Sequence, residues 1–186
     1  MARIADIEKF LSPALREKAE TMKRARGLPT LGFYEDLMVH PALFECVENL
    51  GTFLRFHGSL PERLREAAIL MAAVEQRSAF EWQTHQQTAR KAGLSESEID
   101  AIGSAQPLDR DLETVRSIVL ATIRNQPAPQ SSFDSFASMT SLTAAVELIT
   151  LSAFYRMMAG LGSAFESTLP NAAPPPWDRR HPAGMP

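Results

Sequence analysis

The chain has 186 residues, of which 45% are hydrophobic and 22% charged, proportions typical of a soluble globular protein with a sizeable core. Its formal net charge is −3 and its lysines and arginines are scattered, which argues against a nucleic-acid-binding surface. Cys46 is the only cysteine, so an intrachain disulfide is excluded, and a reducing cytoplasm is the expected location.

Apolar residues recur at helical spacing along the chain, and no segment alternates as a β-strand does, so we predict an all-α fold. Ser12 and Pro13 form an N-cap and a first-turn proline, which predict a helix that ends near Gly27. A helix breaker follows at residues 28–32. We expect residues 1–60 to form a helical extension that leads into the main domain.

Pro41 begins a second predicted helix, which closes at Gly58. Its apolar positions are expected to share one inward face: Leu43, Phe44, Val47, Leu50 and Leu54. Cys46 lies among them and is predicted to be a buried, unreactive thiol.

A helical hairpin is predicted next, with one helix over residues 61–76 and another over residues 79–92. Gly93 is suited to cap the end of the second helix. Ser95 and Glu98 have the spacing of a capping box, which predicts the start of a short helix.

Three more helices are predicted over residues 109–125, 133–139 and 142–165. The last is the most apolar part of the chain, but it contains Glu147 and Arg156, so we expect a buried helix rather than a membrane span. The main domain is predicted at residues 61–168.

The end of the chain differs in composition. Residues 169–186 carry six of the thirteen prolines and no periodic apolar pattern, which predicts an extended arm. An exposed indole is costly, so Trp177 favours an arm that docks on a neighbouring subunit. A disordered tail is the alternative.

Glu81 and His85 form the most informative polar pair. Their spacing of four residues puts both on one face of a helix, where a carboxylate orients an imidazole for general acid–base chemistry. Ser78 lies on roughly the same face. The alternative is a solvent-exposed Glu–His pair with no catalytic role, which has the same spacing. The spacing alone favours this alternative. No other histidine has a comparable partner, so a metal site is a minor option.

Glu66, on the preceding helix, borders an apolar face beside Arg65. A carboxyl group turned to the interior there would have a raised pKa and would suit proton transfer near neutral pH. A solvated carboxylate at the helix edge is the alternative, which this helix alone favours.

An ordered set of short motifs spans Leu60 to Ile102: Arg65-Glu66-x-x-Ile69-Leu70, Glu81-Trp82-x-x-His85, Ala89-Arg90, Gly93-Leu94-Ser95 and Glu98-Ile99. This set resembles the carboxymuconolactone decarboxylase family, which belongs to the alkylhydroperoxidase D-like superfamily. His40-Pro41-Ala42-Leu43 upstream and the run from Glu147 to Tyr155 downstream extend the similarity over about residues 39–161. The resemblance implies a helical bundle built round the hairpin and assembled into homo-oligomers, commonly trimers or hexamers.

In the peroxidase branch of that superfamily, the site is a Cys-x-x-Cys, a histidine four residues after the second cysteine, and a glutamate on the preceding helix. Counting back from His85 puts the two cysteine positions at Ser78 and Glu81, and the glutamate at Glu66. Both cysteines are therefore missing, as they are in the decarboxylase branch. The resemblance thus implies proton transfer rather than thiol peroxidase chemistry.

The implied activity is that of a cofactor-free lyase, which releases CO₂ from a small lactone or related organic acid and protonates the dienolate-like carbon that remains. We predict His85 as general acid, Glu81 as its orienting partner and Glu66 as a second relay group. Substrate-binding roles are predicted for three neighbours: Trp82, Ser78 and Arg65. No metal is expected, and a small-molecule substrate and further copies of the chain are the expected partners.

Two alternatives stay open. An antioxidant protein of the peroxiredoxin type would need Cys46 in place of the missing cysteine pair. A non-catalytic helical oligomer would need only that Glu81 and His85 pack at a subunit interface.

Overall fold

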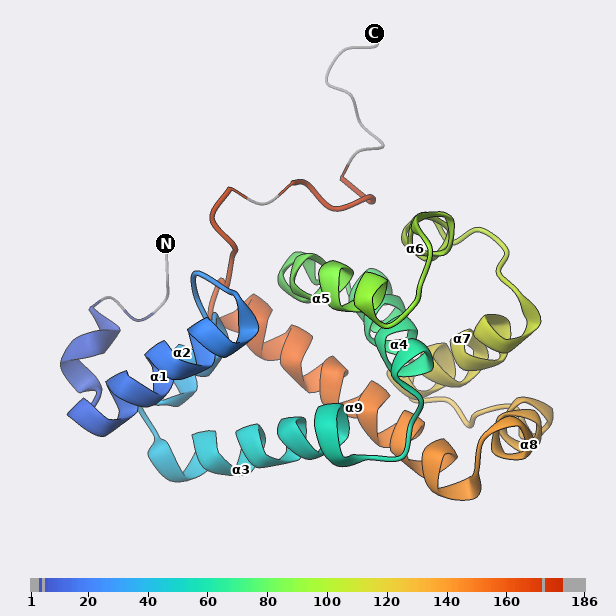
Figure 1. The fold of residues 1–186 in the computed structure, drawn as a ribbon, viewed down its shortest axis with the longest axis horizontal. Coiled ribbons are helices and arrows are strands. Elements are labelled where there is room, and N and C mark those ends of the chain that lie inside the picture. Colours follow the sequence, from blue (N-terminus) through green and yellow to red (C-terminus); the bar gives the residue numbers. More distant parts are fainter. Residues whose placement is uncertain (1–3, 5, 172, 179–186) are drawn as a thin grey trace, which may run out of the picture.

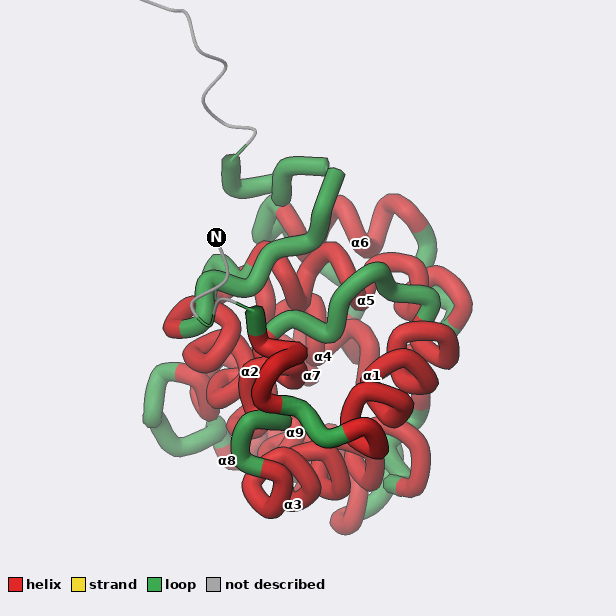
Figure 2. Tube along the Cα trace, turned by 90° about the vertical axis from the view of Figure 1, so that its left-hand side faces the viewer, coloured by secondary structure: helices red, strands yellow, loops and turns green. Residues whose placement is uncertain are grey.

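The computed structural model describes residues 4, 6–171 and 173–178. Within them the chain forms helices and loops and no strand, so the predicted all-α class is confirmed (Figure 1; Figure 2). The α-helices are α1 (Pro13–Arg26), α2 (Phe33–Leu37), α3 (Pro41–Thr52), α4 (Glu62–Glu75), α5 (Ala79–Lys91), α6 (Glu96–Gly103), α7 (Arg110–Ile123), α8 (Gln130–Met139) and α9 (Leu142–Ala164). A 3-10 helix, η1 (Ile7–Phe10), precedes α1, and a π-helical turn, η2 (Phe53–His57), continues α3.

Helix α4 lies at the centre of the molecule. It packs against α5, α6, α7 and α9, and ten consecutive residues, Leu64 to Ala73, are buried (Figure 1). Because this part of α4 is buried on every side, a charged side chain in it is not solvated by water and needs a partner inside the protein. Glu66 is such a residue.

Several helix ends form as their residues predict. Ser12 accepts a hydrogen bond from the Leu15 backbone N–H, and Gly27 closes α1 with a left-handed φ of 64°. Both bonds of the capping box between Ser95 and Glu98 are present at the start of α6. Local sequence therefore sets these helix boundaries.

Helix α3 differs from its prediction. The buried side is Phe44, Val47 and Gly51, whereas Leu43 and Leu50 are 46% and 41% exposed. Phe44, Val47 and Gly51 recur at helical spacing on one stripe, and Leu43 and Leu50 fall outside it. At Gly51 a side chain would come within 3.0 Å of the Phe154 ring, so glycine lets α3 approach α9.

The prediction of a buried Cys46 is wrong, because this thiol is exposed on the outer side of α3. Helix α2 and η1 are also absent from the prediction. Each is too short for a periodic pattern, yet α2 buries Phe33 and Tyr34 and directs them into the core.

Helix α9 is the one described helix that is long and apolar enough to cross a membrane, with a mean hydropathy of 1.3 over its best window. Half of that window is buried in the protein, and α9 packs against α4, α7 and α8. It is a core helix here, as the charges of Glu147 and Arg156 predict.

The described part of the C-terminal arm, residues 169–171 and 173–178, contacts its own chain through Ala173 and Trp177. The Trp177 ring meets the Trp82 ring edge to face at 5.9 Å between centroids, and the Gln83 side chain donates a 2.7 Å hydrogen bond to the Ala173 carbonyl. Trp177 is therefore half-buried against its own chain, and docking of the arm on a neighbouring subunit stays a prediction. The prediction for residues 179–186 lies outside the described residues.

Candidate active site

The site forms where α4 and α5 lie side by side. Glu66 projects from α4 toward α5, and Glu81 and His85 project from successive turns of α5. All three side chains are almost fully buried, with residue exposures of 1% for Glu66 and 5% each for Glu81 and His85. Burial of three ionisable groups in one place is costly unless they are paired, which marks this region as a candidate functional site.

The imidazole of His85 has a different partner on each nitrogen. Nδ1 lies 2.9 Å from Glu66 Oε2, and Nε2 lies 3.1 Å from the Tyr155 hydroxyl on α9. Glu81 Oε2 lies 3.6 Å from Nε2, close enough for charge interaction but beyond a good hydrogen bond. An ionised Glu66 accepts the Nδ1–H, so in the neutral ring Nε2 is an acceptor and the Tyr155 hydroxyl donates to it.

The pKa values of the two carboxyl groups beside His85 are shifted in opposite directions. Burial raises the pKa of Glu81, and the nearby cations only partly offset that effect. Burial is also the largest influence on Glu66, but the hydrogen bond from His85 and the charges of His85 and Arg55 outweigh it and lower the pKa of Glu66. Glu66 is therefore a fixed anion, whereas Glu81 holds a proton to higher pH than an ordinary carboxyl group.

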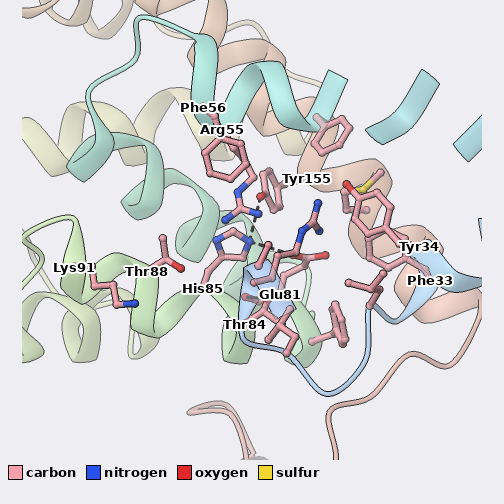
Figure 3. A pocket seen from close by; sticks show the side chains of 17 residues that line it. Phe33, Tyr34, Arg55, Phe56, Glu81, Thr84, His85, Thr88, Lys91 and Tyr155 are labelled. Carbon is pink, nitrogen blue, oxygen red and sulfur yellow. Dashed lines mark hydrogen bonds and ion pairs between the residues drawn. The ribbon is translucent and has the colours of Figure 1, made fainter. Parts of the chain in front are cut away.

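His85, Glu81 and Tyr155 line a cavity of about 220 Å³ (Figure 3). Glu66 is not part of the lining and reaches the site through its contact with Nδ1 of His85. Residues of α1, α2, η2, α5 and α9 enclose it. Five aromatic side chains form much of its wall: Phe33, Tyr34, Phe56, Phe80 and Phe154. Three cationic side chains also line it: Arg26, Arg55 and Lys91. The cavity suits a small anionic molecule with an apolar body.

Arg55 reaches the cavity from η2. Figure 3 shows its side chain pointing toward Tyr155 and His85. Burial disfavours its charge, but Tyr155, Glu66 and Glu81 outweigh burial and raise the pKa of Arg55. Burial also raises the pKa of Tyr155 well above its ordinary value, so its hydroxyl keeps its proton.

The structure brings together three of the predicted site residues: Glu66, Glu81 and His85. Their geometry differs from the expected pairing, because the imidazole is oriented by the hydrogen bond that its Nδ1–H donates to Glu66 on the neighbouring helix, not by a bond to Glu81. Glu81 lies on the side of the ring that faces the cavity. The spacing of four residues indicates a shared helix face, but it does not decide which carboxylate bonds the ring.

Trp82, Ser78 and Arg65 do not line the cavity. Trp82 faces away, toward Gly103 and the C-terminal arm. Ser78 is the N-cap residue of α5, and the Nε atom of Arg65 lies 3.4 Å from Glu66 Oε1. Substrate-binding roles for these three residues receive no support from their positions.

Four cavity residues were not assigned a role from the sequence: Arg26, Tyr34, Arg55 and Tyr155. Tyr155 is part of the family resemblance, but it follows His85 by 70 residues in the sequence, so the sequence does not predict that the two side chains are in contact. Arg55 lies in a π-helical turn, where α-helical periodicity no longer predicts direction. Arg26 and Tyr34 flank the breaker before α2, which carries no periodic signal.

Within the described residues, no group of three or more histidine, cysteine or acidic side chains has the arrangement of a metal site. The single thiol, Cys46, is not part of the cavity lining. The functional groups that meet the cavity are therefore an imidazole, a carboxyl group, hydroxyl groups and cations, which suit proton transfer on an anion.

A known protein family matches the part of the chain that carries the imidazole and the two carboxyl groups of this site. Residues 41–118 match the model of the carboxymuconolactone decarboxylase family, a span that contains Glu66, Glu81 and His85. No curated protein sequence matches the chain. The match begins inside the predicted N-terminal extension, and the division into residues 1–60, 61–168 and 169–186 stays a prediction.

Two solved structures share the fold. One, an uncharacterized peroxidase-related protein from Silicibacter sp. TM1040, has a TM-score of 0.73 and 11% identity, over 87% of this chain and 89% of that one. The other is a protein of unknown function from Agrobacterium tumefaciens, described as a putative antioxidant defence protein AhpD. It has a TM-score of 0.63 and 22% identity, over 72% of this chain and 94% of that one. Residues 41–118 are therefore similar to the carboxymuconolactone decarboxylase family, and the chain shares its fold with these two solved structures.

Proposed function

We propose that the protein is a cofactor-free lyase that removes CO₂ from a small lactone or related organic acid by acid–base catalysis at His85. The observation that carries this proposal is the placement of the imidazole. Its Nδ1 is held by the buried carboxylate of Glu66, while its Nε2 faces the cavity between Tyr155 and Glu81. Such an arrangement fixes the ring and leaves one nitrogen to exchange a proton with a bound molecule.

The reaction balances without an added oxidant or reductant. The bond between the substrate carbon and its carboxylate breaks, the electron pair passes into the conjugated lactone or carbonyl group, and CO₂ leaves. For this step the imidazole of His85 carries a proton on each nitrogen, beside the carboxylate of Glu66. The resulting dienolate carbon takes the proton from Nε2, which leaves the neutral ring. Glu81, 3.6 Å from Nε2 and with a raised pKa, passes a proton back to Nε2 and is itself reprotonated from solvent.

The cavity wall supports this chemistry in a second way. Phe33, Phe80 and Phe154 offer an apolar setting for the carboxylate that is lost. A carboxylate that gives up its hydration there is brought closer in energy to neutral CO₂. The cations of the lining are available for negative charge elsewhere on the substrate.

Thiol peroxidase chemistry is disfavoured by the residues present. It needs a thiolate at the site, whereas the positions of the cysteine pair are Ser78 and Glu81, and Cys46 is on the outer side of α3. A purely structural role is disfavoured because buried ionisable groups with oppositely shifted pKa values meet at a cavity.

We also propose a cytoplasmic homo-oligomer, a trimer or hexamer. Support comes from an apolar groove beside η2 and α9, where Phe53, Leu142 and Val146 are 47%, 63% and 55% exposed. Sedimentation equilibrium should give a multiple of the 20.5 kDa chain mass, and Val146→Asp should lower it. A monomeric wild-type protein would contradict this part of the proposal.

The activity is tested by screening small carboxylated lactones and β-keto acids for CO₂ release. The wild-type protein, His85→Gln and Cys46→Ser form the set. We expect turnover by the wild-type protein and by Cys46→Ser, and a rate lower by at least about a hundredfold in His85→Gln. Circular dichroism checks that the helices are intact. Loss of activity in Cys46→Ser would instead support redox chemistry.

A further inference from the structure

Two arginines face the cavity without a carboxylate partner. Arg26 enters from the end of α1 and Arg55 from η2. Neither forms an ion pair with any residue in the described part of the chain, whereas five other arginines do so: Arg63, Arg65, Arg90, Arg116 and Arg124. Glu66 and Glu81 interact with Arg55 through their charge, and Glu81 also interacts with Arg26, but no direct ion pair uses the N–H donors of either guanidinium group.

Aromatic rings hold both groups in place. The Arg26 guanidinium lies 5.0 Å from the centre of the Tyr34 ring, and the Arg55 guanidinium lies 4.9 Å from that of Phe56. A ring face stabilises a cation but uses none of its in-plane N–H donors. Arg55 is therefore positioned while its donors remain available for a ligand, and Arg26, which also interacts with the Tyr34 hydroxyl, has further N–H donors beyond that contact.

Arg55 carries a second indication. Its Nε is buried and has no hydrogen-bond partner among the described residues. A buried donor without an acceptor is destabilising, so such a group normally has a ligand or water partner in the working protein. A guanidinium edge that includes Nε is the donor arrangement that binds a carboxylate through two parallel hydrogen bonds.

The backbone of η2 accounts for the direction of Arg55. The Gly58 N–H bonds the Phe53 carbonyl five residues earlier, at 3.0 Å, and this π-helical turn follows directly on α3. The buried face of α3 continues to Leu54 in η2. Arg55, the next residue, lies beside this buried face and lines the cavity. π-Helical turns of this kind occur frequently at functional sites.

We propose that Arg55, together with Arg26, binds a carboxylate that the substrate keeps through the reaction, and so selects substrates with a second anionic group. The inference rests on the proposed function only in placing the substrate in this cavity. The aromatic wall then receives the carboxylate that leaves, and the arginine pair receives the one that stays. The two residues determine specificity, and the proton transfer remains with His85.

The test uses calorimetric titration of the full chain with two probes of similar length, glutarate and pentanoate, which differ in the second carboxylate. We expect wild-type protein to bind glutarate at least about tenfold more tightly than pentanoate. Arg55→Gln should remove that preference by weakening glutarate binding while pentanoate binding stays unchanged. Arg124→Gln, which removes a charge paired with Glu75 outside the cavity, is the matched control and should keep the preference.

Equal affinity of the wild-type protein for the two probes, or no binding of glutarate at millimolar concentration, would overturn the proposal. So would a preference retained in Arg55→Gln. If Arg55→Gln fails to fold, Arg26→Gln carries the same test, because loss of either arginine should remove the preference. His85→Gln separates this inference from the proposed function, since it should keep the glutarate preference even when CO₂ release is lost.

Discussion

A hydrogen bond of 2.9 Å joins Glu66 Oε2 on α4 to His85 Nδ1 on α5, and both side chains are almost fully buried. The bond holds the imidazole so that Nε2 faces the cavity. Glu66 is therefore a positioning residue, which acts on a substrate through His85.

Glu66→Gln should lower turnover by at least about tenfold, because an amide holds the ring but does not stabilise a positive charge on it. The pH profile of kcat should also move, which a purely structural role for Glu66 would not cause. Steady-state rates between pH 5 and 9 measure both effects. An unchanged profile with intact circular dichroism would contradict the positioning role.

Glu66 and Glu81 should affect stability with opposite dependence on pH. The pKa of Glu66 is lowered in the fold, so its contribution is present above the ordinary carboxyl pKa and is lost as pH falls through the folded value. Glu66→Gln should therefore be more destabilising at pH 7 than at pH 3.5.

The pKa of Glu81 is raised, so the stability that its protonated form contributes is present at low pH and is lost as pH rises through the folded value. Glu81→Gln should gain stability relative to wild type between pH 4 and pH 7, by about 1.4 kcal/mol per unit of separation between the folded and unfolded pKa values. Urea unfolding at the two pH values measures this. Parallel behaviour of the two variants would contradict the opposite shifts.

Tyr155→Phe should remove the 3.1 Å hydrogen bond to His85 Nε2 and keep the buried ring. We expect a loss of about 1 kcal/mol in unfolding free energy and a several-fold change in kcat. Tyr34→Phe is the comparison, because Tyr34 lines the same cavity without a hydrogen bond to His85. Equal effects of the two substitutions on kcat would show that the hydrogen bond between Tyr155 and His85 has no specific role in catalysis.

Gly103→Ala should displace the C-terminal arm. An added Cβ would lie 2.8 Å from Pro176 and 3.0 Å from Trp82, so one of them must move. Acrylamide quenching of tryptophan fluorescence should increase, since Trp177 loses its contact with Trp82.

Gly160→Ala is the matched control for the arm, because nothing lies within 4 Å of its added Cβ. It should leave quenching unchanged and raise stability by about 0.5–1 kcal/mol through helix propensity. Increased quenching in Gly160→Ala, or none in Gly103→Ala, would contradict the docked position of the arm.

The sequence predicts most of the fold because helix starts and stops are local. Ser12, Gly27 and Ser95 mark boundaries that the structure reproduces through hydrogen bonds within a few residues. The errors arise where helical periodicity is interrupted or ambiguous. Helix α2 is too short to show a pattern. Helix α3 carries apolar residues on two sides, and the pattern does not decide which side is buried, so the predicted burial of Cys46 is wrong.

The site is predictable only as far as residues share a helix or a recognised motif. Glu66, Glu81 and His85 follow from spacing and family resemblance. Arg55 and Tyr155 reach the same cavity because η2 and α9 lie next to α5 in the fold. Residue spacing along the chain does not predict that contact. The pairing of His85 with Glu66 likewise depends on how α4 and α5 are rotated against each other.

The most direct test of the central claim is turnover of a carboxylated lactone in D₂O by the wild-type protein and by His85→Gln. We predict that wild-type protein releases CO₂ and yields a product with one deuterium on the carbon that lost the carboxylate, and that His85→Gln does so at least about a hundredfold more slowly. Turnover by His85→Gln at the wild-type rate, with its helices intact, would contradict proton transfer at this site.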